Sequence, residues 1–266
     1  MQLSGDITMM RTSLVDGNAN YFLPIGNTEV SMNELVGKQI KLSFNHRITC
    51  SNCGRKTNKS FSQGYCFPCA RSLARCDMCI IKPETCHHHL GTCREPEWGL
   101  ANCFAPHIVY LANSSGIKDG ITRKTNTPGR WIDQGAVSAI PILEVGSRID
   151  SGLIEVALKS FVADKTNWRN MLKNEVDVSD LVSMKTSLLS KVSYEINKTG
   201  AITLKDDVVN IRYPVIKYPS KVVSLNLDKT PTISGVLEGI KGQYLLLDSG
   251  VLNIRKFSSY NLTLSS

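Results

Sequence analysis

The strongest constraint on this chain is a doubled Cys-x-x-Cys pattern in its first third. Cys50-x-x-Cys53 and Cys66-x-x-Cys69 are separated by twelve residues. Each pair can form a tight knuckle in which two thiolates point at one ion, and four sulfurs complete a tetrahedral zinc shell. Gly54 directly follows the first pair and permits the left-handed turn that such knuckles often need. The spacing therefore predicts a structural zinc site, because a closed shell leaves no position for a substrate.

A third pair, Cys76-x-x-Cys79, predicts a second structural zinc ion. Its remaining ligands are expected further along the chain, and the spacing does not select two from the candidates Cys86, His87, Cys93 and Cys103. All nine cysteines lie between residues 50 and 103, and in a reducing compartment such pairs serve metal binding rather than disulfides. Zinc would fold a segment that is too poor in apolar residues to fold alone. Free core cysteines and a catalytic zinc are the alternatives, and this pattern disfavours both.

The composition describes a basic chain without a membrane segment. Its 266 residues carry a formal net charge of +8, which suits an anionic partner such as nucleic acid, DNA or RNA. Many soluble proteins are mildly basic, so the charge alone does not decide the partner. No run of about eighteen apolar residues occurs, and the N-terminus lacks the pattern of a signal peptide. We therefore expect a cytoplasmic protein without a membrane contact, and its oligomeric state stays open.

The hydrophobic pattern predicts an α+β fold in five segments. These are an N-terminal β segment at 1–49, a zinc-binding domain at 50–106, a central domain at 107–175, a long helix within 176–200 and a β-rich domain at 201–266. Because chain termini often meet, the first segment is expected to pair with the last one in a sheet or barrel. The strands expected in these two segments are 21–25, 37–44, 233–237, 243–247, 251–257 and 260–264.

The central segment reads as strand, turn, strand, loop, helix and strand. The expected strands are 108–111, 120–122 and 140–145, and Pro128 can open the helix because proline is tolerated at the first helical position. Helical periodicity then predicts helices at 152–162, around 168–172 and at 179–198.

The stretch from His107 to Trp168 resembles the GIY-YIG nuclease superfamily. Ile108-Val109-Tyr110 matches its first motif, and Lys118-Asp119-Gly120 matches the second with lysine in place of tyrosine. The helical arginine, the metal-binding glutamate and the late asparagine of that superfamily match Arg130, Glu155 and Asn167. The resemblance implies a central three-stranded sheet with helices and a Mg²⁺-dependent phosphodiester-cleaving activity.

The resemblance also implies roles for the matching residues. Glu155 would hold Mg²⁺, and Arg130 and Arg123 would fork onto phosphate oxygens. Tyr110 or Lys118 would orient the attacking water or take its proton, and His107 is a second candidate base. Each of these residues also has an ordinary structural interpretation. Arg130 can pair with Asp133 or Glu144, for example, and Glu155 with Lys159.

The chain is also similar to an uncharacterised family of bacterial and archaeal zinc-motif proteins, a domain of unknown function. The phrases that carry this likeness are GYCFPC, CREPEW, VYLANSSGIKDGITR, RWIDQGA and DKTNW. That family brings no activity with it. One departure from the nuclease pattern also matters: Asp119 stands where an apolar residue is usual. It favours the alternative that the scaffold is a non-catalytic module that binds nucleic acid or a protein.

Overall fold

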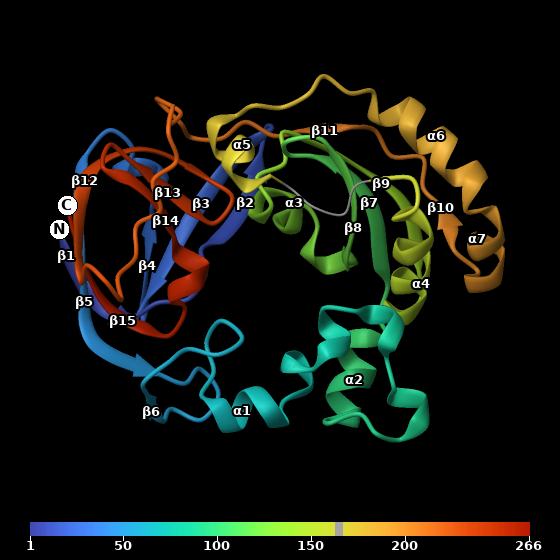
Figure 1. Ribbon diagram of the computed structural model, residues 1–266, viewed down its shortest axis with the longest axis horizontal. Coiled ribbons are helices and arrows are strands. Elements are labelled where there is room, and N and C mark those ends of the chain that lie inside the picture. The colour runs from blue at the N-terminus through green and yellow to red at the C-terminus, as the bar shows by residue number, and fades with distance from the viewer. Residues whose placement is uncertain (163–166) are drawn as a thin grey trace.

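The computed structural model describes residues 1–162 and 167–266. Three antiparallel sheets are present among these residues, together with helices and a Cys-rich segment. Figure 1 shows strands from both chain ends gathered on one side and a central sheet with its helices on the other, with the Cys-rich segment connecting the two. The mixed α and β class with a Cys-rich cluster is therefore confirmed. In the phrase DKTNW, residues 164–166 lie outside the described residues.

The largest sheet is built from both ends of the chain. Its order is β1-β15-β5-β12-β13-β14, with β6 paired to β5. The bounds are β1 Gln2–Asp6, β5 Gln39–Thr49, β6 Lys56–Thr57, β12 Thr232–Lys241, β13 Tyr244–Leu247, β14 Gly250–Asn253 and β15 Tyr260–Ser265. Antiparallel pairing of β1 with β15 confirms that the two termini share a sheet, as Figure 1 also shows. The expected strand at 251–257 is shorter, because a 3-10 helix, η7, occupies Ile254–Phe257.

The remaining N-terminal strands form a three-stranded sheet of their own, which the sequence did not predict. They are β2 (Arg11–Val15), β3 (Asn18–Ile25) and β4 (Thr28–Ser31). Alternate residues of β3, including Tyr21 and Leu23, are buried in the same core as the terminal sheet. A short 3-10 helix, η1, follows at Asn33–Leu35. Because side chains alternate across a strand, one face of β3 is enough to join the two sheets.

The central sheet has the order β10-β9-β7-β8, with β11 also paired to β9. Its bounds are β7 His107–Asn113, β8 Ile117–Arg123, β9 Ser138–Val145, β10 Ile202–Thr203 and β11 Val209–Asn210. The sequence predicted the three longer strands and placed 201–266 in a separate β-rich domain. Two short strands from that segment instead cover the outer edge of β9, which would otherwise be left unpaired.

Strand β7 is buried along its whole length because it is central and covered on both faces. Ile108 and Tyr110 pack into the core shared with the terminal sheets, whereas Val109 and Leu111 pack against the helical layer. This alternation joins the two halves of the molecule through one strand, and it directs Tyr110 toward the side on which helix α3 lies.

The helices cover the two faces of the central sheet unequally. Helices α4 (Arg148–Leu158), α6 (Leu181–Lys191) and α7 (Ser193–Thr199) pack on one face, and α3 (Gly129–Asp133) lies on the other. The predicted helix at 179–198 is thus two helices, since the backbone leaves the helical conformation at Val192. A further helix, α5, spans Trp168–Lys173, and a 3-10 helix, η6, spans Lys124–Asn126.

The Cys-rich segment contains mainly short turns of helix. They are α1 (Phe67–Ser72), η2 (Ala74–Cys76), η3 (Met78–Ile80), η4 (Pro83–Thr85), η5 (His88–Leu90) and α2 (Pro96–Cys103). Across the described part of the chain, no helix is both long enough and apolar enough to cross a lipid bilayer.

Candidate metal centre and anion pocket

The first two cysteine pairs meet at one point. Cys50 follows β5 and Cys53 lies in the turn after it, while Cys66 caps α1 and Cys69 lies within that helix. Their four sulfur atoms all lie within 4.8 Å of one another, and Cys53 Sγ is 3.8 Å from Cys66 Sγ. Zinc–sulfur bonds of about 2.3 Å in a tetrahedron place sulfurs about 3.8 Å apart. The cluster therefore fits a structural zinc ion, as the spacing predicted.

The backbone around this cluster is arranged to hold thiolate. Although burial opposes ionisation, backbone N–H groups of Cys53, Cys66 and Asn52 lower the pKa of the Cys50 thiol to about 6. The side-chain amide of Asn52 donates to Cys69 Sγ over 3.5 Å. Gly54 adopts φ 69°, the left-handed turn expected of a knuckle. The Asn52 donor lowers the pKa of Cys69, but burial and the Cys66, Cys53 and Cys50 thiols raise it to about 12. The donors therefore favour thiolate at Cys50, and a zinc ion would displace the remaining thiol protons on binding.

The other cysteines divide differently from the sequence prediction. Cys79, Cys86, Cys93 and Cys103 line one small pocket together with His87 and His88. Cys76, which was expected to share an ion with Cys79, instead packs beside the first cluster and Leu73. The reason is local, because Asp77 accepts a hydrogen bond from the Cys79 backbone and starts a new turn between the two cysteines.

A second, larger pocket of about 340 Å³ lies where three parts of the chain meet. Strand β8 and helices α3 and α4 form one side, the Cys-rich segment forms a second, and η7 of the terminal half supplies Arg255. Its lining residues are Ile80, Ile81, Pro83, Lys118, Asp119, Gly120, Ile121, Arg130, Gln134, Arg148, Glu155 and Arg255. We call it the anion pocket, because four of these residues are cationic. Lys118, Arg130 and Glu155, which the nuclease resemblance singled out, are brought together here.

Arg130 is the electrostatic centre of the anion pocket. Its positive charge adds to burial in lowering the pKa values of Lys118, Arg148 and Arg255. The lowered pKa values mean that Arg130 repels the other three cations. Their assembly therefore costs free energy that a bound anion would recover. An Arg guanidinium suits phosphate or carboxylate because its N–H groups form a planar fork.

Tyr110 is buried behind the lining of the anion pocket and is not itself one of the lining residues. Its side chain is fully buried, and its hydroxyl donates to Gln134 Oε1 over 2.9 Å. The phenol ring lies across Gly120, where an added Cβ would be 2.6 Å from the Tyr110 hydroxyl oxygen. Burial raises the pKa of Tyr110 to about 12, although Arg130 opposes this. Tyr110 is thus a neutral donor that positions Gln134, and the predicted proton-accepting role would fall to Lys118.

Lys118 has the pKa of a group that exchanges protons near neutral pH. Burial and the charge of Arg130 lower its pKa from 10.5 to about 8, while Asp119 opposes the shift. Only 7% of Lys118 is exposed. An amine with a pKa near the working pH is suited to general acid–base catalysis.

The same shift predicts how stability depends on pH. Between about pH 8 and pH 10.5 the unfolded chain holds the Lys118 proton and the folded chain releases it, so stability rises with pH in that window. The difference amounts to about 3 kcal/mol at about 1.4 kcal/mol per pKa unit. We expect the free energy of unfolding of wild type, measured relative to Lys118→Met by urea titration, to rise across this window. A difference that does not change with pH would contradict the assignment.

Glu155 faces the anion pocket from helix α4. Burial raises the pKa of its carboxyl, and the negative charge of Glu84 adds to this, while Lys159, Arg148 and Arg130 oppose it. Glu84 Oε2 is buried and finds no hydrogen-bond partner among the described residues. Glu84 thus acts on Glu155 from the Cys-rich segment, beside the pocket rather than in its lining.

The other residues that the resemblance singled out lie elsewhere. His107 is buried, its Nδ1 contacts the Ala105 carbonyl over 2.7 Å, and burial lowers its pKa to about 4. Arg123 donates to Asn102 Oδ1 over 2.6 Å at the exposed end of β8. Asn167 caps helix α5 by accepting from the backbone of Arg169 and Asn170. None of the three lines the anion pocket as the structure describes it.

Four residues at or beside the anion pocket were missed by sequence reasoning. Arg148 had a usable signal, because it precedes Glu155 by two helical turns and so lies on the same face of α4. Gln134 lies within the RWIDQGA phrase, but an uncharged glutamine was not considered as a candidate site residue. No sequence pattern pointed to Arg255 or Glu84, because only the folded chain brings them near β8 and α4.

Comparison with known proteins identifies a family without an assigned activity. The family model described as "Protein of unknown function (DUF2797)" matches residues 37–262. No curated protein and no solved structure matches the chain. The match supports the likeness to an uncharacterised family, and nothing in these comparisons identifies the central segment as GIY-YIG.

Proposed function

The chain belongs to the DUF2797 family of proteins of unknown function, and we propose that it binds the phosphate backbone of nucleic acid in the anion pocket and cleaves it with Mg²⁺. The zinc-binding cluster of Cys50, Cys53, Cys66 and Cys69 would serve as structural support. The observation that carries the proposal is the assembly of Lys118, Arg130, Arg148 and Arg255 around one pocket.

The charge balance of the anion pocket supports an anionic ligand. Four cations line it against the two carboxylates Asp119 and Glu155. The cations come from two separate parts of the chain, the central segment and η7, and the cost of their mutual repulsion would be offset by a bound anion. The net charge of +8 agrees with a polyanionic partner, because a uniformly basic chain attracts nucleic acid over a distance.

Mg²⁺ fits the donor set at Glu155. This ion takes one or two carboxylates and keeps several waters and phosphate oxygens, and Glu155 would supply one carboxylate from the pocket wall. When bound, Mg²⁺ supplies charge neutralisation on the phosphate and on the leaving oxygen. The remaining work is assigned to the chain. Arg130 would orient the phosphate by a forked contact, and Lys118 would take the proton of the attacking water.

A non-catalytic binding module is the second candidate. Arg130, Arg148 and Lys159 all lie near enough to lower the pKa of Glu155, so cations surround the carboxylate that would hold Mg²⁺. In this alternative Glu155 only orients the arginines, and the phosphate backbone is held without cleavage. Asp119 in β8, where the nuclease pattern has an apolar residue, also favours this alternative.

Cleavage assays separate the two candidates. Labelled DNA and RNA, single- and double-stranded, are incubated with the protein and Mg²⁺ or Mn²⁺. We expect Glu155→Gln to lower the cleavage rate at least about 10²-fold because metal stabilisation of the transition state is lost. Glu144→Gln is the matched control, since Glu144 pairs with Lys124 over 2.8 Å outside the pocket and should keep near wild-type activity.

Each outcome assigns one candidate. Wild-type cleavage that survives Glu155→Gln contradicts the metal role of Glu155. Binding without cleavage by the wild type supports the binding module. The absence of both binding and cleavage for every substrate contradicts the proposed function itself.

A further inference from the structure

We propose that Cys79, Cys86, Cys93 and Cys103 bind a second structural zinc ion, with Cys76 and His87 excluded from its shell. This inference does not depend on the chemistry of the anion pocket. It assigns the ligands that cysteine spacing left open, and it departs from the expected pairing of Cys76 with Cys79.

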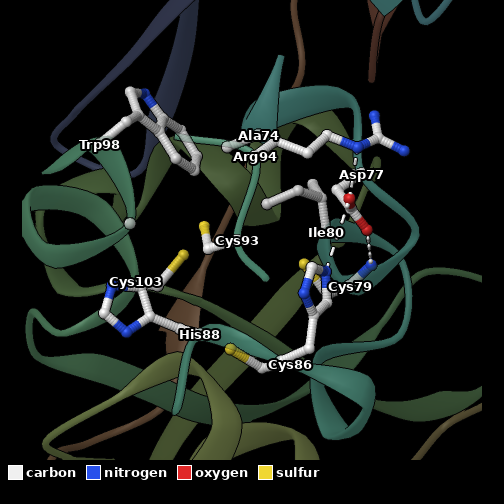
Figure 2. Close-up of a pocket in the computed structure, with 12 residues that line it drawn as sticks. Ala74, Asp77, Cys79, Ile80, Cys86, His88, Cys93, Arg94, Trp98 and Cys103 are labelled. Carbon is white, nitrogen blue, oxygen red and sulfur yellow. Dashed lines mark hydrogen bonds and ion pairs between the residues drawn. The ribbon is translucent and has the colours of Figure 1, made fainter. Parts of the chain in front are cut away.

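Four thiols surround one small pocket. Figure 2 shows the sulfur atoms of Cys86, Cys93 and Cys103 around the same space, and Cys79 lines this pocket as well. The pocket measures about 20 Å³, room for a single ion. Its thiols are gathered less closely than those of the first cluster, but rotation of a cysteine side chain between rotamers moves its sulfur toward the centre. The set is therefore ready to close on one soft divalent cation.

The segment that carries these thiols has almost no core of its own. Between residues 75 and 106 only Pro83 and Gly99 are buried. Met78, Ile81 and Leu90 are exposed, so apolar packing does not stabilise this stretch. A segment of this length without a core keeps one conformation when a disulfide or a metal cross-links it. The cysteines of this stretch are free thiols, the form in which they can lose a proton and bind a metal.

The rival ligand set at the edge of this pocket is already engaged. Asp77, Cys79 and His87 also lie within 4.8 Å of one another. Asp77, however, pairs with Arg94 Nε over 2.6 Å, and the His87 nitrogen that faces this set, Nε2, lies 3.6 Å from Asp77 Oδ2. A cation at Asp77 would face the Arg94 guanidinium directly, which opposes binding. We assign Asp77, Arg94 and His87 to a polar shell that holds the Cys79 turn in place.

The second ion would also fix one wall of the anion pocket. Ile80, Ile81 and Pro83 line that pocket and lie between the ligands Cys79 and Cys86. Arg148 Nη2 donates to the Ile80 carbonyl over 2.6 Å. Helix α4 packs closely on this loop, since a Cβ at Gly152 would be 2.6 Å from the Glu84 nitrogen. Zinc at the four thiols would thus fix the loop against which helix α4 packs, and with it the positions of Arg148 and Glu155 in the anion pocket.

Metal counting on the full chain tests the assignment. Zinc per chain is measured by elemental analysis for wild type and for Cys86→Ser, Cys103→Ser, Cys76→Ser and His87→Ala. We expect about two ions in the wild type, about one in Cys86→Ser and Cys103→Ser, and about two in the Cys76→Ser and His87→Ala controls. Absorption of the Co²⁺-loaded wild type provides a second readout that does not depend on a variant folding. Two tetrathiolate sites give only sulfur-ligated cobalt spectra.

The possible outcomes are decisive. One ion in the wild type overturns the second site. Loss of an ion in Cys76→Ser or His87→Ala, with retention in Cys103→Ser, overturns the ligand set. A Co²⁺ spectrum with nitrogen or carboxylate ligation at the second site overturns it as well. Metal content is measured without an activity assay. A failure of the proposed cleavage would therefore not affect this test.

Discussion

Cys66→Ser is expected to remove the zinc ion of the first cluster and to lower the stability of the whole chain by at least about 5 kcal/mol. Structural zinc contributes apparent binding free energies of about 10–16 kcal/mol, of the same size as the total stability of a domain. The knuckle is also tied to the terminal sheet, because Thr49 N donates to the Ser259 carbonyl over 2.9 Å and the Ser51 and Ser259 hydroxyls are 2.6 Å apart. Loss of the ion is therefore expected to destabilise the terminal sheet as well.

Thermal unfolding followed by circular dichroism measures this effect. A loss of about 5 kcal/mol corresponds to a fall in Tm of about 10–20 °C for a chain of this size. Cys76→Ser is the matched control, since Cys76 packs beside the cluster without belonging to it. Equal Tm values for wild type and Cys66→Ser, at equal zinc content, would contradict a metal at these four cysteines.

Arg130→Ala is expected to lower the rate of phosphodiester cleavage by about 10²–10³-fold, the usual cost of removing one preorganised donor to developing charge. The charge of Arg130 lowers the pKa of each of the other three cations, Lys118, Arg148 and Arg255. The same substitution should raise the pKa of Lys118, since one of the two causes that lower it is removed. The pH profile of cleavage should shift upward accordingly.

Arg123→Ala is the control for this substitution. Arg123 was also expected to contact phosphate, but it lies at the exposed end of β8 and donates to Asn102. Initial rates over a pH series for both variants make the comparison. A larger loss in Arg123→Ala than in Arg130→Ala would place the phosphate elsewhere.

Cysteine spacing predicted the first metal cluster because the information is local. A Cys-x-x-Cys knuckle fixes both of its ligands within one turn, so Cys50 with Cys53 and Cys66 with Cys69 needed only to meet. The same reasoning paired Cys76 with Cys79, whereas the structure packs Cys76 against the first cluster. Successive thiols of the other pocket are seven to ten residues apart in the chain, and only the turns between them bring them together.

The strands and helices of the central segment were also largely predictable, because alternation and helical periodicity mark them locally. The edge strands β10 and β11 were not, since two residues carry no periodicity. The same limit applies to the anion pocket. Lys118, Arg130 and Glu155 lie within forty residues of one another, whereas Arg255 reaches the pocket through the return of the C-terminal sheet.

The most direct test of the account is the salt dependence of oligonucleotide binding. Affinity of labelled single- and double-stranded oligonucleotides is measured between about 50 and about 200 mM salt for wild type and Arg130→Ala. If Arg130 contacts phosphate, wild-type affinity falls steeply with salt, and Arg130→Ala binds more weakly with a slope reduced by about one unit. Affinity that is independent of salt, or identical slopes for the two proteins, would contradict a phosphate site at Arg130.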